Sequence, residues 1–230
     1  MTVEPREASA QTATLHRPIF AAQALSRQDT VTLEAAYCLR AAVFARELGW
    51  VPVGRDGRER DRCDDVALHF AAFAGRAGGL VLAGYARVLL PEQTFMLERE
   101  FSALLAGQSL RANPKRAFEV SRFVVHPAYR RASDAGGRGV ADHLARAITR
   151  WALACGRMEW YAVCEVRHIR ALRLRGLPFA RFGRTIAYQP GVWACAARLS
   201  IPEAAARLRE RHMRDYLWYT QGAPGPWTHA

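Results

Sequence analysis

The sequence predicts a mixed α/β (α+β) fold, in which a central mixed sheet is flanked by helices on both faces. Two observations predict it: apolar strand-like segments alternate with segments of helical spacing, and half of the 230 residues are hydrophobic, enough to bury a full core. The length fits one domain, which we expect over residues 17–221. A flexible arm of residues 1–16 is expected to precede it and a flexible tail of residues 222–230 to follow it.

A helix is expected between Ser26 and Gly49. Leu33, Tyr37, Arg40 and Phe44 are spaced by four, three and four residues and therefore share one helical face. The following polar stretch, residues 51–65, contains two glycines and no periodicity. It is predicted to be a loop.

Three strands and a short helix come next. Residues 66–74 and 80–90 have strand character, and Pro91 ends the second of them. Residues 95–105 suit a short helix. Residues 117–125 (AFEVSRFVV) are the strongest strand candidate in the chain.

The remaining segments alternate between helix and strand. A glycine-containing loop at residues 130–139 leads into a helix that runs to Gly156. Two further strands are expected at residues 158–166 and 192–200, with a helix at 167–176 between them. A last helix is expected to begin at Ser200, where the spacing to Glu203 has the form of a capping box.

The charge is the strongest compositional signal. Thirty-three cations against 21 acidic residues give a net charge of +12, which implies an acidic partner such as nucleic acid, an anionic membrane, or an acidic protein or cofactor. Because the cations are spread along the chain rather than clustered, a nucleic-acid-binding module is the weaker interpretation. No apolar run is long enough for a membrane span, and the polar N-terminus does not resemble a secretory signal. We expect a cytoplasmic protein whose five cysteines are reduced and mostly buried.

Several ionisable residues occupy positions where packing alone would favour apolar ones. Arg40 lies on the apolar face of its helix, where it either reaches solvent at the core edge or pairs with an anion. Arg87, Glu119 and Arg122 lie inside apparent core strands. Strict alternation places Glu119 and Arg122 on opposite faces, so a bulge or splay near Ser121 would be needed for both to serve one site.

Five sequence blocks in order resemble the acyl-homoserine-lactone (autoinducer) synthases. LRAAVFARELGW contains Arg40, Phe44 and Trp50 in the family's spacing, and Glu59, Asp61 and Asp64 follow as E-x-D-x-x-D. GYARVLLPEQTFMLEREFSALL, FEVSRFVV and ALRLRGLPFARFG match later blocks. Taken on composition alone, the loop 51–65 indicates a solvated charged loop, and the functional alternative is a carboxylate cluster that binds a cation.

The resemblance implies a GNAT-like fold and a reaction that joins an acyl thioester to the α-amine of S-adenosylmethionine, with lactonisation and release of methylthioadenosine. The acyl group would come from acyl carrier protein or coenzyme A. The resemblance also implies roles for those residues that match functional positions of the family. The catalytic residues would be Glu119, as general base, with Arg122 and Ser121. The S-adenosylmethionine-binding residues would be Arg40, Phe44, Trp50, Asp61, Asp64 and Arg87.

Two further groups of residues complete the expected site. An acyl pocket between the central strands and the following helix would be lined by Trp151, Tyr161, Val163 and Cys164. The donor's carrier or phosphates would meet Arg130, Arg131 and Arg138, in a loop that resembles the pyrophosphate loop of coenzyme A-dependent acetyltransferases. We expect no metal or redox cofactor. The alternatives are a GNAT-type N-acyltransferase for another amine, of the exosortase-associated kind, and more remotely a nucleic-acid-binding module.

Overall fold

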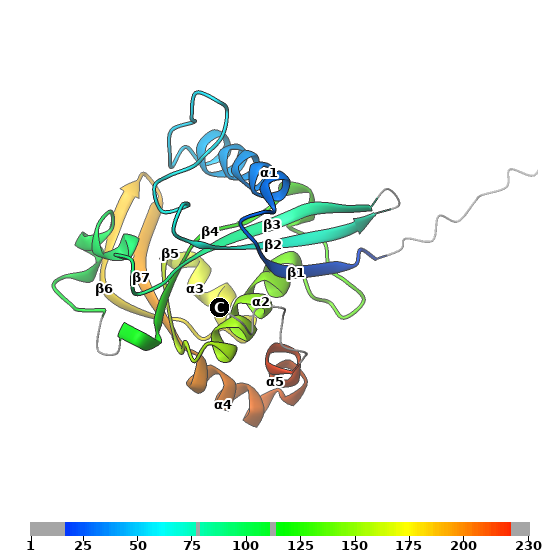
Figure 1. Cartoon of the computed structure of the whole chain (residues 1–230). Coiled ribbons are helices and arrows are strands. Elements are labelled where there is room, and N and C mark those ends of the chain that lie inside the picture. The colour runs from blue at the N-terminus through cyan, green and yellow to red at the C-terminus, as the bar shows by residue number, and fades with distance from the viewer. Residues whose placement is uncertain (1–16, 77–78, 111–113, 222–230) are drawn as a thin grey trace, which may run out of the picture.

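A computed structural model describes residues 17–76, 79–110 and 114–221 and has a single seven-stranded sheet at its centre (Figure 1). The predicted arm and tail lie outside these residues. The strands follow one another in the order β1-β2-β3-β4-β5-β7-β6, and all neighbours are antiparallel except β4 and β5. The strands are β1 (Phe20–Leu25), β2 (Leu68–Arg76), β3 (Gly79–Leu89), β4 (Ala117–Val125), β5 (Glu159–Glu165), β6 (Ala180–Gln189) and β7 (Val192–Ser200). A mixed sheet was the prediction, and it is confirmed.

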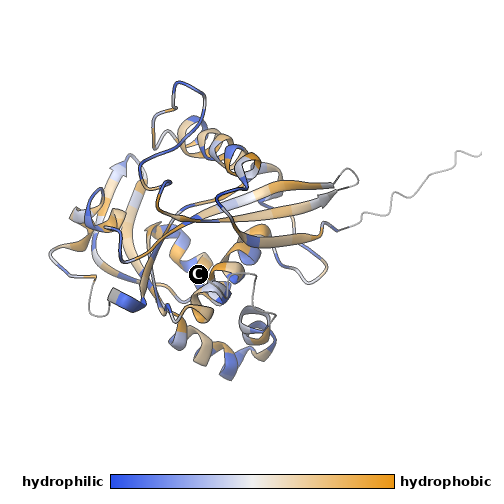
Figure 2. Cartoon of the chain, in the orientation of Figure 1, coloured by the Kyte–Doolittle hydropathy of each residue, from blue (hydrophilic) through white to orange (hydrophobic). Residues whose placement is uncertain are grey.

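Helices cover both faces of the sheet, as predicted. The helices are α1 (Thr30–Arg40), α2 (Val140–Ala154), α3 (Val166–Leu174), α4 (Ile201–Arg211) and α5 (Met213–Thr220). In Figure 1, α1 lies on one side of β2 and β3, and α2, α4 and α5 lie on the other. Figure 2 shows the hydrophobic residues concentrated along the strands, where the main core forms against the inner face of α2. Among the described residues, no helix is both long and apolar enough to cross a membrane.

Strands β4 and β5 separate soon after they meet. They are paired at three positions only, from Ala117 opposite Glu159 to Glu119 opposite Tyr161. Both strands continue beyond that point, so their later residues diverge. A parallel pair that opens in this way leaves backbone N–H and C=O groups at the gap without a ladder partner from the other strand.

Strand β4 carries a β-bulge at the same level. Arg87 pairs with Ser121 and Tyr85 with Val124, so one residue of β3 faces two residues of β4. Arg122, the first of those two, has a φ of +53°, a value that a non-glycine residue rarely adopts. This bulge is the irregularity that the sequence required if Glu119 and Arg122 were to serve one site.

The structure differs from the predicted elements in five places. Strands β1 and β6 were not predicted. Residues 95–105 form two short 3-10 helices, η2 (Met96–Glu98) and η3 (Ser102–Leu105), instead of one α-helix. After Arg40 the first helix continues as a π-helix, η1 (Ala41–Glu47). Helix α4 does begin after Ser200, but the predicted capping hydrogen bond is not made.

Candidate active site

Three arginines and three carboxylates form a closed ring of ion pairs on the α1 side of the sheet. The members of this carboxylate–arginine ring are Arg40, Glu59, Arg122, Asp61, Arg87 and Asp64. Each charged group contacts two groups of opposite sign. Such a ring satisfies charges that would otherwise be too costly to bury, since an unpaired buried charge costs several kcal/mol, about 3–5 when one partner of a pair is removed.

Glu59 and Asp61 are the carboxylates that Arg122 joins. The Glu59 carboxylate accepts from Arg40 Nε at 2.5 Å and from Arg122 Nη2 at 2.9 Å. Asp61 accepts from Arg122 Nη2 at 3.0 Å and from Arg87 Nη1 at 2.6 Å. Glu59 is the ring member that the sequence-based site omitted. Its position in a polar loop gave no signal of burial, although it is only 4% exposed.

Asp64 closes the ring between Arg40 and Arg87, at 2.6 and 2.9 Å. The side chains of these three residues are fully buried, whereas the Asp61 side chain is 27% exposed. Burial raises the pKa of Asp61, but the hydrogen bond from Arg87 and the charges of Arg87 and Arg122 outweigh it and hold that pKa at about 2. Asp61 is therefore an ionised carboxylate at the accessible side of the ring, and Asp64 is its buried support.

Different elements bring the three arginines together. Arg40 is the last residue of α1, and Arg87 lies near the end of β3, where Nε donates to Ser121 Oγ at 3.0 Å. Arg122 reaches the ring because of the bulge in β4. Sequence periodicity placed Arg40 and Arg87 at core positions, and their burial at 0% exposure confirms that interpretation.

A buried histidine supports the ring from the sheet. His69 of β2 lies between the Tyr85 hydroxyl, 2.6 Å from Nδ1, and the backbone oxygen of Asp64, 3.0 Å from Nε2. Burial lowers the pKa of His69, so its imidazole is neutral at ordinary pH. Its Nε2–H then donates to Asp64 and its Nδ1 accepts from Tyr85. The sequence analysis did not single out His69 or Tyr85, because each occupies an ordinary strand position.

Glu119 lies beside the ring at the start of the gap between β4 and β5. It is 1% exposed, and its two oxygens accept from the backbone N–H groups of Met96 and Leu97 at 2.6 and 3.0 Å. Burial raises the pKa of Glu119 to about 7 despite these two donors. A carboxyl group with a pKa near neutrality is suited to proton transfer.

Phe44 and Trp50 stack on each other beside Arg122. Their ring centroids are 6.2 Å apart with an interplanar angle of 23°, and the Arg122 guanidinium lies 5.9 Å from the Phe44 ring. Trp50 is 40% exposed. Phe44 thus links the aromatic pair to the ring through Arg122, and Trp50 is the exposed member of the pair.

The four residues predicted to line one acyl pocket divide between the two faces of the sheet. Tyr161 and Val163 lie on the side of η2 and η3, where Tyr161 contacts Phe95 and Phe182. Trp151 and Cys164 pack in the core around α2 instead. Alternation along β5 is the reason, since residues 163 and 164 point to opposite faces. A single pocket lined by all four is therefore corrected: only Tyr161 and Val163 share the face of Glu119.

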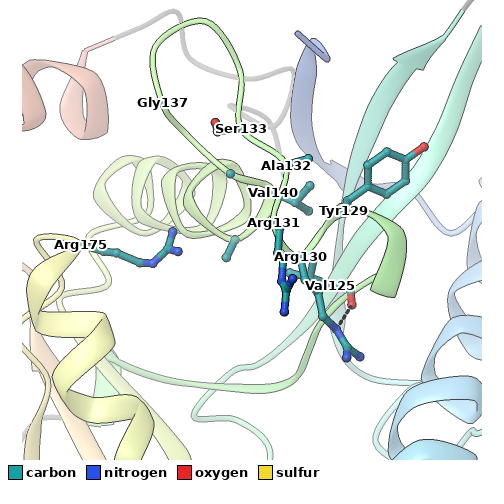
Figure 3. Close-up of a pocket in the computed structure, with 11 residues that line it drawn as sticks. Val125, Tyr129, Arg130, Arg131, Ala132, Ser133, Gly137, Val140 and Arg175 are labelled. Atoms are coloured by element: carbon teal, nitrogen blue, oxygen red, sulfur yellow. Dashed lines mark hydrogen bonds between the residues drawn. The ribbon is translucent and has the colours of Figure 1, made fainter. Parts of the chain in front are cut away.

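The loop before α2 borders a hollow of about 430 Å³, which we call the α2 hollow (Figure 3). Its lining residues are Val125, Tyr129, Arg130, Arg131, Ala132, Ser133, Gly137, Gly139, Val140, Ala141 and Arg175. The lining has three arginines and no carboxylate. Arg130 pairs with Glu47 at 2.6 Å, and Arg175 pairs with Asp142 at 2.8 Å.

Arg138 does not share the α2 hollow with Arg130 and Arg131. It points to the other side of the loop, where it forms an ion pair with Asp215 of α5. The three predicted phosphate- or carrier-binding arginines are thus divided by their own loop. Within the described ranges, no group of three or more His, Cys, Asp or Glu side chains is arranged to hold a metal ion.

Known proteins resemble this chain in sequence. A family model described as an acetyltransferase (GNAT) domain matches residues 39–135. An acyl-homoserine-lactone synthase of Rhizobium radiobacter is 34% identical over 160 residues, which span 67% of this chain and 72% of that relative. The chain belongs to the acyl-homoserine-lactone synthase family. As a member of this family it is an acyltransferase with a GNAT-like fold.

Solved acyl-homoserine-lactone synthases have the same fold. LasI matches with a TM-score of 0.64 at 24% identity, over 81% of this chain and 91% of LasI. BjaI, a coenzyme A-dependent synthase solved with S-adenosylmethionine and isopentyl-CoA, matches with a TM-score of 0.66 at 22% identity, over 84% and 89% of the two chains. FeeM, an N-acyl amino acid synthase from uncultured soil microbes, matches with a TM-score of 0.51 at 20% identity, over 82% and 94%.

Proposed function

We propose that this synthase transfers an acyl group from a thioester to the α-amine of S-adenosylmethionine and that the acylated product closes to an acyl-homoserine lactone, a quorum-sensing signal. The observation that carries the proposal is the position of Asp61 and Glu119. An ionised, accessible carboxylate and a buried carboxyl group with a pKa near 7 lie on one face of the sheet, where β4 and β5 separate.

The acceptor site uses the accessible side of the ring. S-adenosylmethionine carries a positive sulfonium and, near neutral pH, a positive amine. Asp61 attracts the amine, while the exposed face of Trp50, stacked on Phe44, contacts the sulfonium or the adenine. Arg122, which is 14% exposed at its side chain, faces the amino acid's own carboxylate. The buried pairs of Asp64 hold this arrangement in place.

The amine must lose a proton before it attacks the thioester. Glu119 accepts this proton, directly or through one water molecule, because its pKa lies close to working pH. The amine nitrogen then bonds to the thioester carbon. Backbone N–H groups of β4 at the gap stabilise the negative oxygen of the tetrahedral intermediate, since β5 does not use them there. Collapse of the intermediate breaks the carbon–sulfur bond, and the thiolate leaves with a proton.

Lactonisation completes the reaction without a redox step. The carboxylate oxygen of the acylated amino acid attacks the carbon bonded to the sulfonium, and methylthioadenosine leaves with the bonding electron pair. Arg122 is held in position by its ion pairs with Glu59 and Asp61, so its guanidinium stays next to that carboxylate. The chemistry therefore needs no metal and no cofactor beyond the two substrates.

The donor approaches from the α2 side of the gap. Its phosphopantetheine arm passes the α2 hollow, where Arg131 and the first N–H groups of α2 meet phosphate, and its acyl chain lies along Tyr161 and Val163. Coenzyme A and acyl carrier protein both present such an arm. We place the enzyme in the cytoplasm, where both kinds of donor are made, and we assign its positive charge to the donor rather than to nucleic acid.

The test is product formation by the purified protein. With S-adenosylmethionine and a set of acyl-CoA and acyl-carrier-protein donors, we expect release of methylthioadenosine in equal amount to acyl-homoserine lactone. Acyl transfer that is independent of S-adenosylmethionine would contradict the proposal and would support the alternative, an N-acyltransferase for another amine.

A further inference from the structure

A second hollow lies on the opposite side of the loop that borders the α2 hollow. It has a volume of about 380 Å³ and is formed by residues 134–138, by α2 and by α5. We call it the α5 hollow. Its lining residues are Asp134, Gly136, Arg138, Arg146, Arg214, Leu217, Trp218 and Gln221. The mechanism above uses none of them.

The α5 hollow contains an indole ring with two guanidinium groups against it. The guanidinium carbons of Arg138 and Arg146 lie 4.6 and 4.9 Å from the Trp218 ring centroid. Arg146 is held in this position because Nε donates to the backbone oxygen of Trp218 at 2.6 Å. Planar guanidinium and indole groups are the side chains that stack well on a nucleobase.

The lining of the α5 hollow is positively charged. It has three arginines and a single carboxylate, Asp134, whose oxygens are already engaged by the backbone N–H groups of Gly136 and Arg138 and by His143. One of the arginines, Arg138, pairs with Asp215 outside the lining. Burial, together with the positive charge of Arg150, lowers the pKa of Arg146. The lowered pKa therefore reflects mainly the burial of Arg146, and a bound anion would favour its charged form.

We propose that the α5 hollow binds the 3′-phosphoadenosine end of coenzyme A, so that the donor is an acyl-CoA rather than an acyl carrier protein. This inference rests on the proposed function. The two hollows flank one loop, so a ligand that crosses this loop can place phosphates at both. Coenzyme A has a pyrophosphate, a 3′-phosphate and an adenine ring, which match the arginines and the indole of the lining. A carrier protein has no nucleotide and would leave the α5 hollow empty.

The first experiment compares three donors that share one acyl group: acyl-CoA, acyl-dephospho-CoA and acyl-pantetheine. Methylthioadenosine release is measured under saturating S-adenosylmethionine. We expect similar kcat values and a KM that rises about tenfold when the 3′-phosphate is removed, with a further rise when the whole nucleotide is removed, since one charge-assisted hydrogen bond is worth at least that factor. Acyl carrier protein with the same acyl group should have a lower kcat/KM than acyl-CoA.

The second experiment changes the lining of the α5 hollow. Arg214→Ala and Trp218→Leu should each raise the KM for acyl-CoA about five- to tenfold and leave the KM for acyl-pantetheine unchanged. The acyl-pantetheine value also reports that the variants are folded. Arg209→Ala is the matched control, because Arg209 is an exposed arginine of α4 that lines neither hollow. It should change neither KM.

Equal KM values for acyl-CoA, acyl-dephospho-CoA and acyl-pantetheine would overturn the inference and leave the proposed function intact. The same holds if the two variants affect all donors alike, or if acyl carrier protein is the better donor. Release of no methylthioadenosine from any donor would instead remove the proposed function, and the inference with it.

Discussion

At the scale of single residues, two neighbouring aspartates of the acidic loop differ in burial. The Asp64 side chain is fully buried and pairs with Arg40 and Arg87, whereas the Asp65 side chain is 65% exposed and pairs with Arg60. Asp64→Asn leaves two buried guanidinium groups short of a charge partner. We therefore expect it to lower the free energy of unfolding by about 3 kcal/mol or more.

Asp65→Asn is the matched control for that substitution. An exposed pair contributes about 0–1 kcal/mol, so we expect almost no change in stability. Urea unfolding of both variants at neutral pH measures the difference. Equal effects of the two substitutions would show that the carboxylate–arginine ring is not the structural unit described above.

Glu119 predicts a specific dependence of the rate on pH. A general base works when deprotonated, so kcat/KM should rise with pH through about 7, the raised pKa of Glu119, and then level off. Glu119→Gln should lower turnover at least a hundredfold and abolish this step. A profile with the same step near pH 7 in the glutamine variant would assign the titration to another group, such as the substrate amine.

The raised pKa of Glu119 also makes the stability of the protein depend on pH. Its folded pKa lies above the ordinary value of 4.5, so folding favours the protonated form. The stability that Glu119 contributes is present below about pH 4.5 and is lost as pH rises through about 7. Wild type should therefore lose stability relative to Glu119→Gln between pH 5 and pH 8, as urea unfolding at both pH values would measure.

Part of the candidate site could be predicted from residue types alone. Arg40, Arg87 and Glu119 were singled out because a charge at an apolar position of a helix or strand requires a partner. Glu59 was matched in the E-x-D-x-x-D block but given no role, and His69 was missed, because a loop acid and a strand histidine are ordinary in sequence. Their burial results from the folding of residues 51–67 against the sheet, which one-dimensional periodicity does not report.

At the scale of elements, the regular patterns were predictable and the irregular ones were not. Strands β4 and β7 have the boundaries that alternation indicated. The sequence indicated the bulge at Arg122 only as a requirement for Glu119 and Arg122 to serve one site. Strict alternation of strand residues does not predict where an extra residue is inserted. Strands β1 and β6 were missed because both lie at sheet edges, where β1 is short and alanine-rich and β6 is mostly exposed and interrupted by Gly183.

Gly183 fixes the contact between β6 and η3. Its φ is +68°, and a Cβ there would lie 2.0 Å from the backbone oxygen of Leu104. Gly183→Ala should therefore destabilise the protein by about 2 kcal/mol or more, from backbone strain and displacement of η3. Thermal or urea unfolding measures this loss.

Gly191→Ala is the control for that loss. Gly191 has a similar φ of +78°, but an added Cβ would meet no atom within 4 Å. This variant should lose only the strain contribution, about 1 kcal/mol. If both alanine variants were equally stable, the close packing of β6 on η3 would be disproved.

At the scale of the whole molecule, the proposed acceptor site and the proposed donor site lie in different parts of the fold. The carboxylate–arginine ring, Phe44 and Trp50 lie on the α1 face, and the two arginine-lined hollows lie around the start of α2. In the proposed function, the two substrates meet at the gap between β4 and β5, where Glu119 is the last paired residue of β4. The net charge of +12 is compatible with this division, because the arginines of the ring are paired with carboxylates, whereas both hollows are lined mainly by arginines.

The central claim is that S-adenosylmethionine binds at the accessible side of the ring, next to Glu119. An experimental structure of the protein soaked with S-adenosylmethionine tests it most directly. We predict that the amine nitrogen lies within about 3.5 Å of the Asp61 carboxylate or of a water molecule bonded to Glu119. We also predict that the sulfonium or the adenine contacts Trp50. A ligand bound elsewhere, with the ring closed and Trp50 in solvent, would contradict the account.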